Sequence, residues 1–238
     1  MKKALSGKIL NIKNVAKETY ELSFKSDLEK IDAGQFLSIL CPPKTLRRPF
    51  GVYDFENGIL KVLFRLKGDG TNYLRNLKEG DIIKFNAPLG HGFEIKGKKA
   101  LLIGAGIGVA PLVYLNKKLK EQNIETKLIC GFKEKEEAIE GCDFIKIGGT
   151  IIDEVEKNIK EFTPDIIYCC APQIVLKLVS EIAIKHNIEV QVAMEKVMAC
   201  GIGVCRGCII QVKTKEGIEN RSICGDGPVF RGDEVIWE

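Results

Sequence analysis

The chain has 238 residues, 45% hydrophobic and 29% charged, which is the composition of an ordinary globular protein and not of a disordered or fibrous one. Its formal net charge of +4 is small, which argues against nucleic acid or an anionic membrane surface as the main partner. Cysteine is unusual: nine are present, and an odd number argues against a secreted disulfide framework.

No targeting or membrane segment is expected from the sequence. Lys8 and Lys13 interrupt the apolar stretch that would follow the charged start of a signal peptide. The longest lysine-free apolar stretch, residues 100–115, is shorter than the ~20 residues needed to cross a bilayer. We therefore expect a cytoplasmic protein whose thiols are reduced.

Residues 1–97 are expected to form a small antiparallel β-barrel. Apolar and polar residues alternate along 20–24 and 60–66, which is the period of a half-buried strand. Turn sequences rich in glycine, asparagine and aspartate separate these runs. One short helix is predicted over 71–77, with Thr71 as its N-cap.

Residues 98–190 are expected to form a Rossmann-like α/β domain. The apolar run 100–103 is typical of a buried parallel strand, and a glycine-rich turn follows it. Strand and helix then alternate, as in layered α/β folds. Further strands are predicted at 128–130, 144–147 and 166–169, and helices at 111–122 and 174–186.

Residues 191–238 make a third, cysteine-rich and glycine-rich domain. It is too short to bury a core of its own, so we expect something other than apolar burial to hold it.

Four cysteines of this third domain have the spacing of a metal-cluster site. Cys200, Cys205, Cys208 and Cys224 follow the pattern C-x4-C-x2-C-x15-C, whose first part matches the plant-type ferredoxin motif for a 2Fe–2S cluster. Thiolates are soft anionic ligands that suit iron, and intervening glycines let backbone N–H groups point at the sulfurs. A structural zinc site and unligated buried thiols are the alternatives.

A glycine-rich turn is a weaker signal for a nucleotide site. Gly104, Gly106 and Gly108 follow a buried strand and open a helix, which suits the close approach of a diphosphate. Val109 stands where the usual dinucleotide motif has its third glycine, so a tight turn without a ligand is the alternative.

The β-rich domain carries two further candidate anion sites. Arg47 and Arg48 stand between two predicted strands, and an arginine fork suits a phosphate. Gly70 and Thr71 precede the short helix. A solvated arginine pair and an ordinary turn are the alternatives.

Taken in order, these segments resemble the ferredoxin–NADP reductase superfamily, in which a barrel holds a flavin and an α/β domain holds a nicotinamide cofactor. Three segments narrow the resemblance to the electron-transfer subunits of dihydroorotate dehydrogenase B. They are the cysteine motif over 198–208, the sequence Cys-Gly-Asp-Gly-Pro-Val-Phe over 224–230, and Pro-Leu-Gly-His-Gly-Phe over 88–93. The resemblance covers essentially the whole chain.

The resemblance implies roles for particular residues. It implies a nicotinamide site bordered by Gly104, Gly106 and Gly108, with Cys170 near the nicotinamide ring. The implied iron ligands are Cys200, Cys205, Cys208 and Cys224. The implied FAD site has Arg48 near the phosphates, and its residues are Arg48, Pro49, Phe50, Gly51, Phe64, Arg65, Leu66, Gly70 and Thr71.

The resemblance also implies an electron path and a partner. Electrons would pass from the FMN of a dihydroorotate-oxidising subunit through the 2Fe–2S cluster and FAD to NAD+, in de novo pyrimidine (UMP) biosynthesis. The partner would join this chain in a heterotetramer of two plus two subunits, and this chain alone would not oxidise dihydroorotate.

Two other functions stay open at this point. Small subunits of NADH-dependent ferredoxin:NADP oxidoreductases and sulfide dehydrogenases are similar to this chain, but they typically carry aspartate where this chain has Cys200. A zinc-stapled binding module without a redox cofactor is the second alternative. The chain also departs from the family's usual residues, with Gly51 for serine, His91 for asparagine and Ala171 for glycine.

The other four cysteines, Cys41, Cys130, Cys142 and Cys169, are predicted to pack as small apolar side chains in or near strands. Cys169 and Cys170 are adjacent in a strand, so they are expected to face opposite sides of the sheet.

Overall fold

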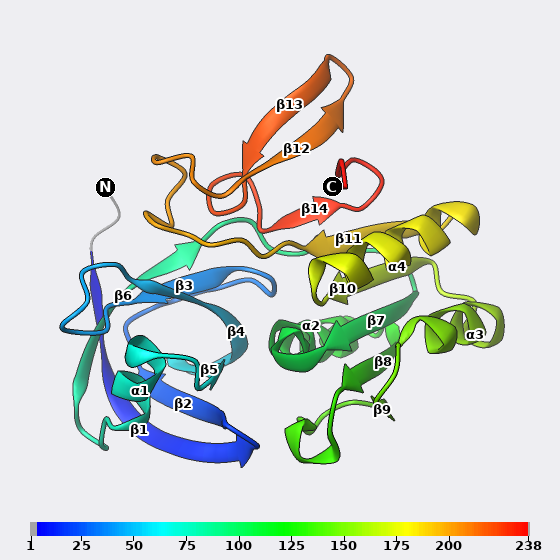
Figure 1. Ribbon diagram of the computed structural model, residues 1–238. Helices are drawn as coiled ribbons and strands as arrows, with labels where there is room; N and C mark the ends of the chain where they lie inside the picture. Colours follow the sequence, from blue (N-terminus) through cyan, green and yellow to red (C-terminus); the bar gives the residue numbers. More distant parts are fainter. Residues whose placement is uncertain (1–3, 238) are drawn as a thin grey trace.

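The computed structural model describes residues 4–237, so the charged start at Met1, Lys2 and Lys3, and the last residue, Glu238, lie outside the described part. An antiparallel barrel lies beside a mainly parallel sheet with helices, and the C-terminal region lies over the junction of the two, with its hairpin projecting outward (Figure 1). The predicted combination of a closed barrel with a Rossmann-like α/β sheet is therefore confirmed.

The barrel closes through six strands in the order β1-β2-β5-β4-β3-β6. Leu22 on β2 pairs with Val62 on β5, and both side chains are fully buried, as the alternating pattern requires. Closure leaves the barrel without a free strand edge. The strands are β1 (Leu5–Ala16), β2 (Thr19–Lys25), β3 (Phe36–Ile39), β4 (Arg48–Glu56), β5 (Ile59–Arg65) and β6 (Ile82–Leu89).

The second layer is a six-stranded sheet in the order β14-β11-β10-β7-β8-β9, with only β14 antiparallel to its neighbour. Its strands are β7 (Lys99–Ala105), β8 (Glu125–Phe132), β9 (Phe144–Ile147), β10 (Ile166–Cys170), β11 (Glu189–Ala193) and β14 (Val229–Arg231). The helices are α2 (Val109–Glu121), α3 (Ile152–Phe162) and α4 (Gln173–Lys185). Among residues 4–237, none of the helices has the length and apolar character that a membrane crossing requires.

The helices begin earlier than predicted, and one of them was not predicted. Helix α1 (Asp69–Arg75) and helix α2 each start two residues before the predicted position, so Thr71 lies inside α1 and is not its N-cap. The Thr71 hydroxyl still accepts hydrogen bonds from the backbone N–H groups of Lys67 (2.9 Å) and Gly68 (3.2 Å). Helix α3, between β9 and β10, is a finding of the structure alone.

Apolar burial does hold the C-terminal region, contrary to expectation. The strands β12 (Ile209–Thr214) and β13 (Gly217–Ser222) form a hairpin, and β14 then pairs with β11 at the edge of the central sheet. Ile223 and Val235 are buried in the same apolar cluster as the sheet and α4. The region thus uses the core of the preceding domain, which its own composition cannot reveal.

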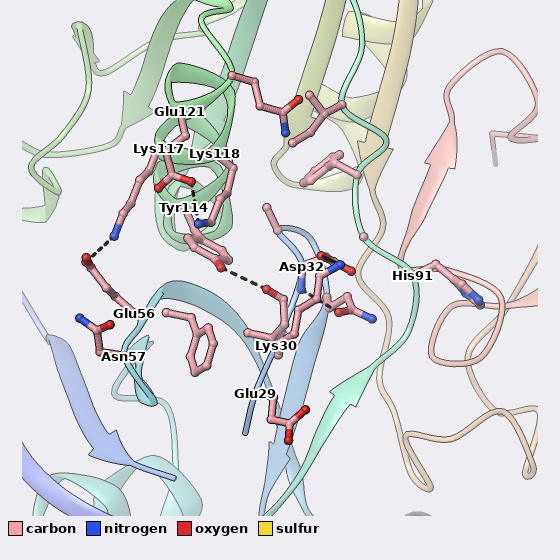
Figure 2. A pocket seen from close by; sticks show the side chains of 18 residues that line it. Glu29, Lys30, Asp32, Glu56, Asn57, His91, Tyr114, Lys117, Lys118 and Glu121 are labelled. Carbon is pink, nitrogen blue, oxygen red and sulfur yellow. Dashed lines mark hydrogen bonds and ion pairs between the residues drawn. The ribbon is translucent and has the colours of Figure 1, made fainter. Parts of the chain in front are cut away.

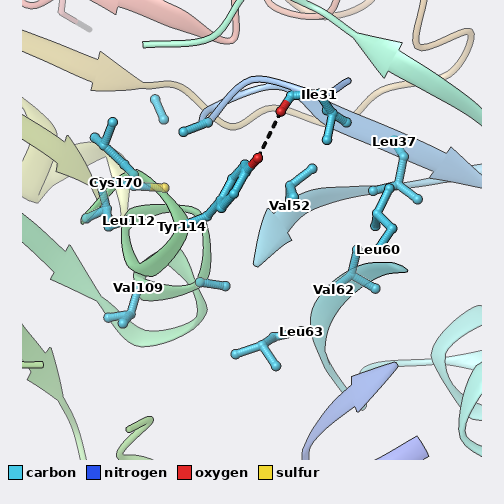
Figure 3. Close-up of a cluster of buried hydrophobic side chains, with 14 of the residues drawn as sticks. Ile31, Leu37, Val52, Leu60, Val62, Leu63, Val109, Leu112, Tyr114 and Cys170 are labelled. Carbon is cyan, nitrogen blue, oxygen red and sulfur yellow. Dashed lines mark hydrogen bonds between the residues drawn. The ribbon is translucent and has the colours of Figure 1, made fainter. Parts of the chain in front are cut away.

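One apolar core joins the barrel to helix α2. Figure 3 shows Tyr114 of α2 directed at the barrel side, where Ile31 and Val52 lie, whereas Leu112 lies on the opposite side of the helix near Cys170; all of them belong to this cluster. The Tyr114 hydroxyl also donates a hydrogen bond to the carbonyl of Ile31 (3.1 Å), in the segment before β3. Because one buried cluster includes both layers, barrel and sheet are fixed relative to each other.

The C-terminal region is also tied to the barrel through a close backbone contact. The N–H of His91 donates to the carbonyl of Gly227 (2.6 Å), just beyond β6. Gly90 has a φ of +68°, and a Cβ there would lie 2.5 Å from the Gly227 oxygen and 2.6 Å from Pro228 Cδ. A side chain at position 90 therefore has no room, quite apart from the backbone conformation.

Gly90→Ala is expected to destabilise the protein more than Gly80→Ala. Gly80 has a φ of +91° and nothing within 4 Å of its would-be Cβ, so that variant carries only the left-handed strain, about 1–2 kcal/mol. Gly90→Ala adds the clash with Gly227 and Pro228, about 1–3 kcal/mol more. Urea unfolding measures both, and equal losses would mean that the contact between positions 90 and 227 is unimportant.

Candidate functional site

The β12–β13 hairpin brings the third and fourth cysteines of the motif together. Cys208 directly precedes β12 and Cys224 follows β13 by two residues, and the pairing of Ile209 with Ser222 sets the register. The two sulfurs lie 3.3 Å apart, and the N–H of Cys224 donates to the Cys208 sulfur (3.5 Å). Two thiols separated by a whole hairpin in sequence are thus neighbours in space.

The preceding loop places the first two cysteines beside this pair. The N–H of Cys205 donates to the Cys200 sulfur (3.4 Å), and the N–H of Gly203 donates to the Cys224 sulfur (3.0 Å). Burial raises the pKa of the Cys200 thiol, but the N–H groups directed at it outweigh burial and lower the pKa to about 6. The loop therefore favours a thiolate at position 200.

The four cysteines fit a 2Fe–2S cluster by the chemistry of their donors. Cys200 and Cys205 form one pair and Cys208 and Cys224 the other, which suits a cluster of two irons held by four thiolates. The Gly203 N–H joins the two pairs, and Cys205 is exposed at the rim of the loop. Among residues 4–237, no three His, Cys, Asp or Glu side chains are placed to share a single metal ion.

On the barrel, Arg48 lies against the start of α1. A Cβ on Gly70 would lie 3.1 Å from Arg48 Cγ and 3.2 Å from its Nε, so Gly70 leaves room for this side chain. Arg47 instead donates to the Lys84 carbonyl on β6 (3.1 Å). Arg48, Gly70 and the neighbouring Thr71 are therefore brought together, while Arg47 is not part of the group.

The barrel wall next to them carries aromatic side chains and an unsatisfied donor. Phe50 and Phe64 meet edge to face with ring centroids 6.3 Å apart. Arg65 Nη1 pairs with Glu137 (3.3 Å), whereas Arg65 Nε is buried without a hydrogen-bond partner in the described structure. A buried N–H of this kind fits a site that takes a polar ligand such as a flavin. Of the other predicted flavin residues, Pro49 is exposed and Leu66 is half-buried.

The glycine-rich turn lies where the barrel meets the sheet. Its central residues form the short 3-10 turn η1 (Gly106–Gly108), which contacts β5 of the barrel. A Cβ on Gly108 would lie 2.8 Å from the carbonyl carbon of Cys170 and closer still to its oxygen, so Gly108 allows the turn to pack on the end of β10. A Cβ on Gly104 would lie 2.8 Å from Val109 Cγ2. The carboxyl ends of β7 and β10 thus meet at this turn.

Cys170 lies in the expected strand but is fully enclosed. Its side chain belongs to the cluster shared with the barrel (Figure 3), while Cys169 belongs to the cluster on the other face, as predicted. Burial raises the pKa of the Cys170 thiol well above its usual range. Cys170 is therefore a neutral thiol that can line a ring but cannot act as a thiolate.

A cavity of about 780 Å³ lies elsewhere, between the C-terminal half of α2 and the barrel (Figure 2). It contains none of the predicted site residues. Part of its charge is in ion pairs: Lys117 with Asp54 and Glu56, and Lys118 with Glu121. The cavity is therefore separate from the predicted cofactor sites.

Cys130 and Cys142 correct one prediction. They are joined by a disulfide, with Cα atoms 6.2 Å apart, between β8 and the segment that leads into β9. The prediction of two separate packing thiols was wrong because the spacing does not reveal that the chain returns alongside β8. Cys41 and Cys169 are buried free thiols, in agreement with the prediction.

Comparison with known proteins also points to an iron–sulfur site in the C-terminal region. The family described as the iron–sulfur cluster binding domain of dihydroorotate dehydrogenase B matches residues 195–236. The chain is 39% identical to the dihydroorotate dehydrogenase B (NAD(+)) electron transfer subunit of Caldanaerobacter subterraneus subsp. tengcongensis, over 100% of both chains. It is also 39% identical to the subunit of the same name from Clostridium acetobutylicum, over 91% of each.

Solved structures show the same architecture. A chain of the NADH-dependent reduced ferredoxin-NADP oxidoreductase, described for flavin-based electron bifurcation, superposes with a TM-score of 0.85 and 27% identity, covering 97% of this chain and 90% of that one. Phthalate dioxygenase reductase shares the fold alone, with a TM-score of 0.67 and 15% identity, over 92% of this chain and 76% of the other. By its full-length identity to curated relatives, the chain belongs to the family of dihydroorotate dehydrogenase B electron transfer subunits.

Proposed function

We propose that this chain is the subunit that reduces NAD+ in a dihydroorotate dehydrogenase, with Cys200, Cys205, Cys208 and Cys224 as the ligands of a 2Fe–2S cluster. The observation that carries the proposal is the cysteine loop, in which four thiols form two pairs and backbone N–H groups point at three of the sulfurs, those of Cys200, Cys208 and Cys224. Such N–H groups stabilise anionic sulfur, as a thiolate-ligated cluster needs.

We propose that FAD lies along the barrel wall that faces the glycine turn. Arg48, which packs on Gly70, supports a contact with the phosphates, since a planar guanidinium suits phosphate oxygens. The orphaned Nε of Arg65 supports a polar ligand at the same wall. The proposed flavin residues are Arg48, Pro49, Phe50, Gly51, Phe64, Arg65, Leu66, Gly70 and Thr71.

Gly51→Ser is expected to raise the affinity for FAD about three- to fivefold, through one added hydrogen bond. A Cβ at position 51 would meet Pro111 at 3.5–3.7 Å, which is ordinary contact, so the fold has room for the side chain. The matched control is Gly51→Ala, which adds the Cβ without the hydroxyl. Titration of the apoprotein with FAD compares them, and equal affinities in both variants would show that the hydroxyl does not reach the flavin.

We propose that the nicotinamide nucleotide lies at the carboxyl ends of β7 and β10, bordered by Gly104, Gly106 and Gly108, with Cys170 next to the ring. Open space around Gly106, which has a φ of +55° and no heavy atom within 4 Å of a would-be Cβ, supports an approach of the diphosphate there. The neutral Cys170 thiol would supply van der Waals contact and a weak donor.

The cofactors supply the redox chemistry: a cluster carries single electrons, and a flavin converts between single electrons and the hydride of NADH. The protein supplies their placement. We propose three functional domains, with FAD in residues 1–97, NAD+ in 98–190 and the cluster in 191–238. The contact of His91 with Gly227 supports close attachment of the cluster region to the barrel.

We propose that the partner is an FMN-containing dihydroorotate-oxidising subunit, assembled with this chain as two plus two subunits in the cytoplasm. Exposed apolar side chains around the cysteine loop support docking there: Val197 is 88% exposed, Val204 75% and Ile202 51%. Apolar side chains this exposed, next to a cluster ligand, are typical of a surface covered by another chain.

The visible spectrum of the purified protein, together with iron and sulfide analysis, tests the proposal. Flavin and iron–sulfur absorbance are expected, together with oxidation of NADH by artificial acceptors. Dihydroorotate oxidation is expected only after the partner is added. A colourless protein containing zinc would favour the stapled binding module instead, and dihydroorotate oxidation by this chain alone would contradict the subunit assignment.

A further inference from the structure

The disulfide Cys130–Cys142 closes the base of a segment that the proposed electron path does not use. Residues 133–141 leave the carboxyl end of β8, pass through the short turn η2 (Lys135–Glu137) and return at Cys142. Asp143 holds this return, because its carboxylate accepts from the Leu128 N–H (2.7 Å) and its own N–H donates to the Leu128 carbonyl (2.9 Å). The disulfide adds a covalent closure at the same place.

The 133–141 segment reaches across to the barrel by three polar contacts. Lys17, in the β1–β2 turn, forms an ion pair with Glu134, and its N–H donates to the Glu136 carbonyl (2.6 Å). Arg65, at the end of β5, pairs with Glu137 (3.3 Å). Arg65 belongs to the proposed flavin wall, so the segment connects the disulfide to that wall.

The same segment borders the nucleotide edge of the sheet. Cys130 pairs in register with Gly104, the first residue of the glycine turn, across β7 and β8. On the return, a Cβ on Gly141 would contact the Val113 side chain of α2 at 3.6 Å. The disulfide therefore lies at one end of a segment packed on both the barrel and the helix that begins at the glycine turn.

We propose that Cys130 and Cys142 form a reversible dithiol/disulfide site, whose oxidised form holds the 133–141 segment in place and so raises the affinity for NAD+. The inference rests on the proposed function, since it takes the carboxyl edge of β7 and β10 as the nucleotide site. In a reducing compartment such a bond is typically transient and responds to redox state.

The exchange reaction is a two-electron reduction by a dithiol. A thiolate of the reductant attacks the Cys142 sulfur, which is partly exposed, and the Cys130 sulfur leaves and takes up a proton. The second thiol of the reductant then displaces Cys142. One disulfide of the reductant forms, one protein disulfide breaks, and two protein thiols remain. Cys130 is fully buried and is therefore the sulfur that a reductant cannot reach first.

The direction of the effect follows from the entropy of the segment. With the bond closed, the segment is already ordered when the nucleotide arrives, so binding does not have to order it. With the bond open, the segment is held by noncovalent contacts alone: the two ion pairs, the Lys17 N–H bond to the Glu136 carbonyl, Asp143 and the apolar contact of Ile139. The ion pair of Lys17 with Glu134 is half-exposed, and an exposed pair is a weak restraint.

The test compares NAD+ binding in the two redox states of the holoprotein. Anaerobic samples are treated with a dithiol or left oxidised, freed of reagent, and titrated with NAD+ by calorimetry; alkylation and mass spectrometry count the Cys130 and Cys142 thiols. Reduction is expected to weaken NAD+ binding about three- to tenfold. Cys142→Ala should bind NAD+ like the reduced protein and should not respond to the dithiol.

Cys41→Ala is the matched control, because Cys41 is also a buried thiol but lies in the barrel, away from this segment. That variant should respond to the dithiol as the parent does. The proposal is overturned if the pair stays as two thiols under oxidising conditions, or if NAD+ binds equally in both states. If NAD+ binds in neither redox state, the proposed nucleotide site is contradicted, and this outcome is distinct from one in which NAD+ binds equally in both states.

Discussion

Cys205→Ser is expected to reduce electron transfer between the partner subunit and this chain by about 100-fold while sparing the reaction with NADH. Cys205 is exposed at the rim of the loop, so the substitution leaves the buried packing of Cys208 and Cys224 intact. Replacing the thiolate by a hydroxyl removes one of the four proposed ligands. Mutating a residue that only hydrogen-bonds to a metal ligand typically lowers metal affinity about 10–100-fold, so losing a ligand itself should lower the affinity for the cluster by about 100-fold or more. Iron and sulfide should fall together.

Two activity measurements distinguish the contribution of the cluster from that of the flavin and nucleotide sites. Dihydroorotate-dependent reduction of NAD+ by the reconstituted complex should fall about 100-fold, in line with the loss of metal. Oxidation of NADH by an artificial acceptor should stay within about twofold, because it needs only the barrel and the glycine turn. Cys41→Ala controls for the loss of any thiol. If the complex kept full activity without iron, the relay through this loop would be excluded.

The cysteine loop could be predicted from sequence because its chemistry is local. Cys200, Cys205 and Cys208 lie within nine residues of one another, and their spacing alone limits the geometry of the loop. The glycine turn was recognisable for the same reason, since the buried strand before Gly104 and the helix after it are adjacent in the chain.

What the sequence did not reveal depends on contacts between distant segments. Strand β14 pairs with β11 only because the chain returns after a hairpin of its own, and no pattern in Val229–Arg231 specifies that partner. The ion pair of Arg65 with Glu137 likewise joins the barrel to the segment after β8. Helix α3 is different: Val155 and Ile159 repeat at helical spacing and are both buried, so the signal was present and was overlooked.

Gly108→Ala is expected to disrupt the nucleotide edge more than any other single methyl group added at the turn. The added Cβ would lie 2.8 Å from the Cys170 carbonyl carbon and closer still to its oxygen. Both of these are backbone atoms, so no side-chain rotation can relieve the clash. Overpacking of this kind costs about 1–3 kcal/mol in the free energy of unfolding. It also pushes η1 away from the end of β10, where Cys170 and the turn together would border the nicotinamide.

The loss should therefore appear in binding as well as in stability. A displacement of about 1 Å at a site that positions a reactant can cost about 100-fold in rate, so kcat/KM for NADH should fall between tenfold and 100-fold. Gly131→Ala is the matched control: it lies at the carboxyl end of the adjacent β8, and its Cβ would meet Ile151 at 3.4–3.8 Å, which is tolerable contact. That variant should lose less than about 1 kcal/mol. If Gly108→Ala lost stability but kept its kcat/KM, Gly108 would serve packing alone, and the nucleotide would have to lie away from the junction of η1 and β10.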